Sequence, residues 1–282
     1  MSAMPNDDGT LRTAEEQAPQ TSETVSVQRW RDGRTEQVLD EVAEEAAIAF
    51  SYNGVAHVVM LATPADLEDL ATGFTLSEAV VERGEEIRSV EVARTEDSLE
   101  VRIGIASGRF SELLRRRRNL AARSGCGLCG AETVEQAIRQ PLPVAGGVEI
   151  TIAELHTALS ELRSRQKLNA RTGSVHAAAW ARPGIGIQIV REDVGRHNAL
   201  DKVIGALVRA RADFSSGYMI VTSRASYEMV QKSAIVGVPL LAAVSAPTAL
   251  AVRLAQQSGL TLIGFARERQ HVVCAHGHRL LD

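Results

Sequence analysis

Two cysteines three residues apart carry the most reactive side chains of this sequence. Cys126 and Cys129 lie within Ser124–Gly130, where glycines flank both of them. Glycine adds no side chain and permits positive φ, so the segment is predicted to be an unhindered loop. A Cys-x-x-Cys pair can be a redox couple, half of a zinc site or a sulfur-transfer loop.

The residues around this thiol loop favour the thiolate form. The arginines of Arg115–Arg118 and Arg123 precede the loop, and a helix is predicted over 131–138 directly after it. Positive charge and a helix N-terminus both lower a thiol pKa, which makes the cysteine a better nucleophile. Glu132 opposes this trend, and the arginines are also typical of a solvated helix face, so only the direction is predicted.

A zinc site and a thioredoxin-like site have less support. A structural zinc ion needs four ligands, and the thiol loop supplies two. Only Cys274, His271, His276 and His278, near the C-terminus, are candidates to complete the set. The loop also follows an arginine-rich helical stretch and not the βαβ unit that a thioredoxin-like motif requires. We therefore expect no permanently bound metal.

The composition indicates a globular protein of the cytoplasm. The 282 residues, of which 45% are hydrophobic, suit one compact unit with two lobes. A net charge of -4 argues against a general nucleic-acid binder. No apolar run approaches the roughly 20 residues of a membrane span, and the polar N-terminus is not a secretory signal. Three cysteines form no disulfide framework and fit a reducing compartment.

Three segments differ in their patterns. Residues 1–22 are polar and are predicted to form a flexible tail. Residues 23–147 are predicted to form a lobe of antiparallel strands with a packed helix, ending in the thiol loop. Residues 148–282, where helices and strands alternate, are predicted to form an α/β lobe that binds a cofactor.

Turn and capping residues define the elements of the first lobe. Two hairpins are predicted, over 47–60 and over 87–105, and the first turns at the Asn-Gly pair 53–54. A helix is then predicted to start with Thr63 as N-cap and Pro64 at its first position.

The second lobe is predicted to hold a mostly parallel sheet with helices on both faces. Helices are expected over 152–166, 196–210, 224–236 and 247–257, and strands over 185–190, 218–222, 240–244 and 260–264. Ligands of such sheets bind at the carboxyl ends of the strands. Asp193, Arg224 and Arg267 stand at or just after such ends.

The sequence resembles the formate dehydrogenase accessory sulfurtransferases, the FdhD family. The motifs that carry the resemblance cover most of residues 120–267, while residues 1–22 lie outside it. They are Ser124–Gly130, Thr172–Ala178, Glu192–Lys202, Ser223–Lys232, Val244–Ala249 and Gly264–Arg267.

The resemblance implies a sulfurtransferase. The family accepts sulfur as a persulfide from a cysteine desulfurase and passes it to the molybdenum (or tungsten) bis(molybdopterin guanine dinucleotide) cofactor of formate dehydrogenase. Cys126 would then carry the persulfide and Cys129 would support it. The resemblance also implies a fold like that of cytidine deaminases. The sequence does not determine the oligomeric state, and a homodimer is one candidate. The sequence does not tell which formate dehydrogenase is served.

The resemblance assigns cofactor binding to one segment, and simple chemistry adds further candidates. The matching segment comprises Phe265, Ala266, Arg267, Glu268, Arg269 and Gln270. Phosphates also need backbone amides at helix starts and basic side chains, which Arg196, His197 and Arg224 offer. Asp193 could accept two N–H groups of a guanine edge. Cys274 stands where the family has a tyrosine or similar residue, and it receives no role.

Plainer explanations exist for several of these residues. His176 is a candidate binding residue or a satisfied core histidine. His197 and Asp201 could orient each other, one turn apart. Glu228 and Lys232 could form a surface ion pair on one helix face with Arg224.

Three other functions were considered. A zinc deaminase needs His-x-Glu, but His176 is followed by Ala177 and Ala178, and the Cys-x-x-Cys precedes the histidine, so this chemistry is excluded. The alternatives that stay open are a cofactor-binding chaperone without sulfur transfer and a thiol-redox or zinc-binding protein.

Overall fold

The computed structural model describes residues 20–94, 98–121, 143–144 and 146–282. The thiol loop with Cys126 and Cys129, the helix predicted over 131–138 and nearly all of the predicted tail lie outside these residues. The description below concerns the scaffold on which that loop is carried.

A four-stranded sheet in the order β4-β3-β6-β5 forms the first lobe. Its strands are β3 (Ala46–Tyr52), β4 (Val55–Ala62), β5 (Ile87–Arg94) and β6 (Leu99–Ile105). Both predicted hairpins are confirmed, and Asn53 takes the positive φ that its turn requires. The central strands β3 and β6 run parallel, so the antiparallel prediction holds for two of the three pairings.

Helices cover one face of this sheet. The lobe holds α1 (Leu67–Ser77), a 3-10 turn η1 (Gly84–Glu86) and α2 (Ser107–Ala121). The predicted start of α1 at Thr63 and Pro64 is wrong, because the N-cap is Asp66. Thr63 is held elsewhere: its backbone N–H donates to the buried carboxylate of Asp193, in the other lobe.

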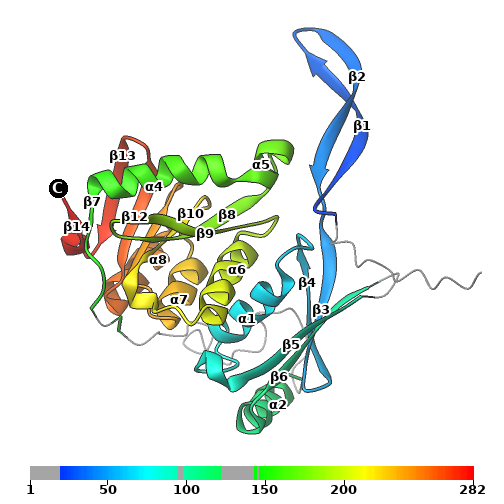
Figure 1. Ribbon diagram of the computed structural model, residues 1–282, viewed down its shortest axis with the longest axis vertical. Coiled ribbons are helices and arrows are strands. Elements are labelled where there is room, and N and C mark those ends of the chain that lie inside the picture. The colour runs from blue at the N-terminus through cyan, green and yellow to red at the C-terminus, as the bar shows by residue number, and fades with distance from the viewer. Residues whose placement is uncertain (1–19, 95–97, 122–142, 145) are drawn as a thin grey trace, which may run out of the picture.

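A two-stranded ribbon projects from the body at the N-terminal side (Figure 1). It consists of β1 (Ser22–Arg31) and β2 (Arg34–Ala43), joined by a tight turn at Asp32–Gly33. At its base, Glu41 pairs with Arg171 of the body at 2.9 Å.

The second lobe is built on a six-stranded sheet in the order β13-β12-β11-β10-β8-β9. The strands are β8 (His176–Arg182), β9 (Gly186–Asp193), β10 (Tyr218–Val221), β11 (Leu240–Ala243), β12 (Thr261–Arg267) and β13 (Gln270–Ala275). Only the β10–β11 and β11–β12 pairings are parallel, while the other three pairings are antiparallel, so the sheet is mixed and the mostly parallel prediction is wrong. β8 and β13 were missed. β8 is alanine-rich, so its own strand propensity is weak and its burial in the sheet decides.

Helices pack on both faces of this mixed sheet (Figure 1). They are α4 (Ile152–Arg165), α5 (Lys167–Thr172), α6 (Arg196–Arg209), α7 (Tyr227–Ile235) and α8 (Ala249–Ser258). Leu155 of α4 belongs to the core on one face, and Val203 of α6 and Met229 of α7 to the core on the other. The short pieces are β7 (Ile150–Thr151), η2 (Phe214–Ser216), η3 (Gly277–Arg279) and β14 (Leu280–Leu281).

The two lobes meet where α1 crosses α6. A Cβ added at Gly73 would lie 1.8 Å from the carbonyl oxygen of Asp201, and one added at Gly205 would lie 1.8 Å from that of Asp69. Only glycine therefore lets the two backbones touch. One cluster of buried residues runs from the first sheet through both helices into the second. The boundary between residues 147 and 148 stays a prediction.

Two of the plainer explanations are wrong. Asp201 pairs with Lys232 at 2.8 Å and not with His197, and both partners of this pair are buried. Burial lowers the pKa of Lys232, but Asp201 and Glu78 outweigh it and raise that pKa. Glu228 pairs with His197 at 2.7 Å and not with Lys232.

Among the described residues, no helix has the length and apolar character needed to cross a membrane.

Candidate functional site

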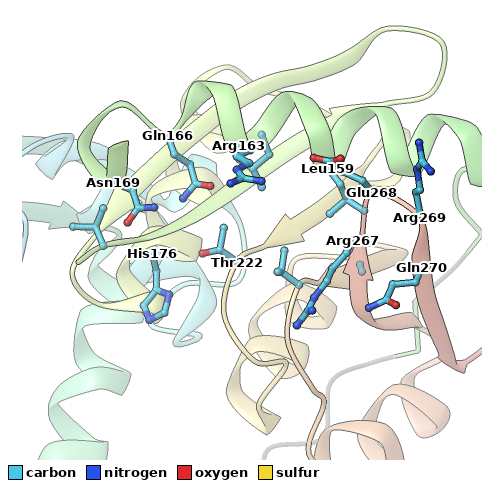
Figure 2. A pocket seen from close by; sticks show the side chains of 14 residues that line it. Leu159, Arg163, Gln166, Asn169, His176, Thr222, Arg267, Glu268, Arg269 and Gln270 are labelled. Atoms are coloured by element: carbon cyan, nitrogen blue, oxygen red, sulfur yellow. The ribbon is translucent and has the colours of Figure 1, made fainter. Parts of the chain in front are cut away.

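A pocket of about 700 Å³ opens at the carboxyl ends of the central strands. It is built by the end of α4 with α5, the start of β8, the residues just after β10 and β11, and the turn between β12 and β13 (Figure 2). The residues that line it are Leu159, Leu162, Arg163, Gln166, Asn169, Val175, His176, Thr222, Val244, Ala266, Arg267, Glu268, Arg269 and Gln270. The position at strand ends is the one predicted from the alternating pattern.

The turn between β12 and β13 forms one wall. Arg267 pairs with Gln270 across a two-residue turn, so their side chains stand next to each other. Figure 2 shows both extending from the turn in the same direction, whereas Arg269 extends the opposite way, toward α4. Phe265 takes a positive φ of 50° and its N–H donates to the Ser245 carbonyl at 3.1 Å. Of the predicted segment 265–270, only Phe265 does not line the pocket.

The opposite wall comes from the junction of α4 and α5, which sequence reasoning missed. Gln166 and Asn169 present amide groups to the pocket (Figure 2). Glu192 fixes this wall, because its carboxylate accepts the backbone N–H groups of Leu168 and Asn169 at 2.9 and 2.8 Å. The sequence shows Glu192 as part of the Glu192–Lys202 motif. That motif does not reveal that Glu192 caps α5, so it could not have predicted this wall of the pocket.

His176 and Thr222 lie between the two walls. Thr222 is tied to β8, because its hydroxyl accepts the Ala177 N–H at 2.9 Å. His176 is half-buried, and this burial lowers its pKa, helped by the positive charges of Arg196 and His197. At neutral pH His176 is therefore an uncharged imidazole that can both donate and accept a hydrogen bond.

The charge of the pocket favours an anion. Arg163, Arg267 and Arg269 contribute three guanidinium groups against the one carboxylate of Glu268. Within the described part of the chain, the side chains of these three arginines form no ion pair and no hydrogen bond. Guanidinium groups bind phosphate with two parallel N–H donors. The site can therefore receive a phosphorylated ligand.

The remaining lining can hold a planar polar ring. Gln166, Asn169 and Gln270 each offer an amide donor and acceptor, which match the mixed edge of a purine. Leu159 and Val244 add apolar surface against which a ring can lie. Phosphate groups at the arginines and a base near the amides make a nucleotide the chemistry that suits this pocket.

Three predicted binding residues lie away from the pocket. Arg196 and His197 open α6, where His197 forms its ion pair with Glu228 of α7. The bond to His197 is the main cause that lowers the pKa of Glu228. Arg224 is exposed and precedes α7, whose N-cap is Ser226, so it does not share the helix face predicted for it. Arg196 and His197 nevertheless lie near enough to His176 to help lower its pKa.

The prediction that Asp193 reads a guanine edge is wrong for this arrangement. Asp193 is fully buried, and its carboxylate accepts the N–H groups of Thr63, Gly195 and Asn198 and pairs with Lys202 at 2.7 Å. No oxygen lone pair is left facing a ligand. The residue instead ties the first turn of α6 to the other lobe.

The C-terminal residues that were candidate zinc ligands do not form a metal site in the described structure. His271 faces His156, with ring nitrogens 3.1 Å apart, and the Cys274 thiol lies 3.5 Å from the Val272 carbonyl. Burial raises the pKa of Cys274, which makes it a poor thiolate. Among the described residues, no group of three or more His, Cys, Asp or Glu side chains could hold a metal ion. The predicted reactive pair, Cys126 and Cys129, lies outside those residues.

Comparison with known proteins gives a consistent result. Residues 43–281 match the FdhD/NarQ family. The chain is 53% identical over 262 residues to the "Sulfur carrier protein FdhD" of Cupriavidus necator, covering 93% of this chain and 91% of that protein. It is 52% identical over 255 residues to the protein of the same name from Xanthomonas euvesicatoria, covering 90% and 91%.

A solved structure shares the fold. The crystal structure of a putative formate dehydrogenase accessory protein from Desulfotalea psychrophila superposes with a TM-score of 0.76, covering 93% of this chain and all of that one, at 24% identity. The family match spans almost the whole described scaffold, including every wall of the pocket. This chain therefore belongs to the FdhD/NarQ family.

Proposed function

We propose that this protein is a cytoplasmic sulfur carrier that takes sulfur from a cysteine desulfurase and gives it to the bis(molybdopterin guanine dinucleotide) cofactor of a formate dehydrogenase. The observation that carries the proposal is the pocket at the strand ends, which is lined by three arginines and three amide side chains. These groups suit the phosphate groups and guanine rings of the cofactor. The relatives named sulfur carrier protein support the same role.

In this proposal the pocket holds one guanine nucleotide arm of the cofactor. Arg267 and Arg163 bind the phosphates, because they are cationic and form no ion pair with another described residue. Gln166, Asn169 and Gln270 read the guanine ring. His176 stays neutral at physiological pH and contributes hydrogen bonds without charge.

The sulfur step uses the thiol loop. The Cys126 thiolate attacks the outer sulfur of the desulfurase persulfide, and the desulfurase cysteine leaves as a thiolate. The new Cys126 persulfide is then cleaved when the Cys129 thiolate attacks its inner sulfur. This attack releases sulfide to the cofactor and leaves a disulfide between the two cysteines, so two thiol electrons balance the reduction of the outer sulfur.

Intact-mass measurement tests the loading step. The purified protein is incubated with a cysteine desulfurase and cysteine, and its mass is recorded before and after treatment with a reductant. The proposal expects a gain of one sulfur that the reductant removes, absent in Cys126→Ala and present in Cys129→Ser. No gain in the wild-type protein, or a gain found on Cys129 alone, would contradict the assignment.

A cofactor-binding chaperone is the second candidate. It is supported by the described lining of the pocket, whose arginines and amide side chains suit a nucleotide. In that case the protein binds guanine nucleotide but gains no sulfur in the mass measurement. Stoichiometric zinc in the purified protein would instead favour a zinc-binding thiol protein.

A further inference from the structure

Two histidines from distant parts of the chain touch beside the pocket. His156 lies on α4 and His271 on β13, and the Nε2 atom of the first is 3.1 Å from the Nδ1 atom of the second. The rings meet edge to face, with their centroids 5.3 Å apart. Both side chains are half-buried. This contact, here called the histidine pair, has no part in the sulfur step.

The histidine pair joins two walls of the pocket. His271 directly follows Gln270, the last residue of the turn that forms one wall. His156 lies three residues before Leu159 and seven before Arg163, so these side chains share one face of α4. Between described residues, the bond of the histidine pair is the only side-chain hydrogen bond that connects α4 with β12 or β13.

The rest of the contact between α4 and this turn is apolar. Leu159 of α4 and Ala266 of β12 belong to one buried cluster. Apolar packing is not directional, whereas a hydrogen bond fixes both a distance and an angle. The histidine pair is therefore the contact that sets how far the turn stands from the helix.

The bond depends on how many protons the two rings carry. A neutral imidazole has one N–H donor and one acceptor nitrogen, so the pair can share a bond while at least one ring is neutral. Two protonated rings present only donors to each other and repel. Burial lowers the pKa of His271, and the charge of His156 lowers it further. The second proton is therefore added, and the bond lost, below the ordinary histidine value of 6.5.

Few other charges act on the histidine pair. The charged groups of α4 and of the turn are Glu154, Glu161, Arg163, Arg267, Glu268 and Arg269. Glu154 accepts the Gly184 N–H, and Glu161 pairs with Arg165. Arg269 extends toward α4 (Figure 2), and Cys274 packs on the opposite face of the sheet. Among the described residues, the one charge that shifts the pKa of His271 is that of its partner in the pair.

We propose that His156 and His271 are positioning residues for nucleotide binding. Their hydrogen bond holds the turn between β12 and β13 at the distance from α4 that the nucleotide requires, and the second proton releases the turn. The inference rests on the proposed function, because it takes the pocket to be the nucleotide site. Nucleotide affinity should therefore fall in acid through two residues that do not line the pocket.

Amide side chains supply a version of the pair that does not titrate. The amide nitrogen of asparagine takes the place of Nδ1 and that of glutamine the place of Nε2. His156→Gln with His271→Asn therefore keeps a hydrogen bond at every pH, whereas His156→Leu removes it. His278→Leu is the matched control, because His278 is exposed and does not line the pocket. Thermal melting verifies that each variant is folded.

Titration calorimetry with guanosine diphosphate, from about pH 7.5 to about pH 5, measures the effect. At the upper pH the double variant and His278→Leu should bind within about twofold of wild type. His156→Leu should bind roughly fivefold more weakly, the factor that one neutral hydrogen bond provides. At the lower pH the wild-type protein should have lost roughly fivefold relative to the double variant. This ratio cancels the titration of His176 and of the phosphate, which both proteins share.

Hydrogen exchange without nucleotide tests the turn itself. After correction for the intrinsic rate, the amides of residues 268–273 should exchange faster in the wild-type protein below about pH 6.5, and not in the double variant. Equal acid losses of nucleotide affinity in these two proteins, or wild-type affinity in His156→Leu, would overturn the inference and leave the nucleotide site intact. No binding of guanosine diphosphate by the wild-type protein at the upper pH would instead refute the nucleotide site, and this inference with it.

Discussion

Arg267→Ala should weaken the binding of a guanine nucleotide to the pocket. Arg267 stands at the end of β12, beside Gln270, and it forms no ion pair with an acidic group among the described residues. A charge-assisted hydrogen bond to phosphate contributes about 1.5–3 kcal/mol, which corresponds to a roughly 10- to 150-fold increase in Kd. Because Arg267 is exposed, we expect the lower half of this range. Titration calorimetry with guanosine diphosphate measures the change.

Arg224→Ala is the matched control for this measurement. It removes the same charge from another exposed arginine that follows a neighbouring strand but does not line the pocket. Salt screens charges over roughly 8–10 Å, so this variant should bind the nucleotide nearly as well as wild type. Wild-type affinity should also fall as salt rises. Equal losses in the two variants, or no nucleotide binding by the wild-type protein at low salt, would refute the placement of the ligand.

The remaining predictions concern the scaffold around the pocket. Gly205→Ala should destabilise the protein by at least about 1–3 kcal/mol in urea denaturation, because its Cβ would lie 1.8 Å from the Asp69 carbonyl; an unchanged midpoint would contradict the packing of α1 on α6. Asp193→Ala should lower the free energy of unfolding by about 3–5 kcal/mol, since it leaves Lys202 buried and unpaired; Asp193→Asn should lose less, and the reverse order would be inconsistent with the ion pair. Burial lowers the pKa of His176 below its ordinary value of 6.5, so the unfolded state binds the proton more readily. The contribution of His176 to stability should therefore be constant above pH 6.5 and decrease as the pH falls below it, and His176→Gln should remove this part of the acid-side slope.

Local signals in the sequence predicted the elements that depend on neighbouring residues. The Asn-Gly pair at 53–54 gave the first hairpin correctly, because both residues accept the backbone angles of its turn. The alternating pattern located Arg267 at the end of a strand, where the pocket lies. These features need no knowledge of the rest of the fold.

Contacts between residues far apart in the sequence explain why some sequence-based predictions of elements and site residues failed. Thr63 looked like an N-cap, but its hydroxyl accepts the N–H of Val194, 131 residues away, and the helix begins later. Asp193 looked like a ligand group, but Lys202 and three N–H donors occupy it. The wall at Gln166 and Asn169 depends on which helix packs beside the turn between β12 and β13, and no short-range pattern encodes that choice.

Transfer of labelled sulfur tests the central claim most directly. The protein is loaded by a cysteine desulfurase with ³⁵S-cysteine, separated from the desulfurase and mixed with the bis(molybdopterin guanine dinucleotide) cofactor. The account predicts that the label moves from the protein to the cofactor, that Cys126→Ser carries no label, and that Arg267→Ala is labelled normally but delivers its sulfur more slowly. Label that stays on the wild-type protein in the presence of cofactor, or label on the cofactor with the Cys126→Ser variant, would contradict it.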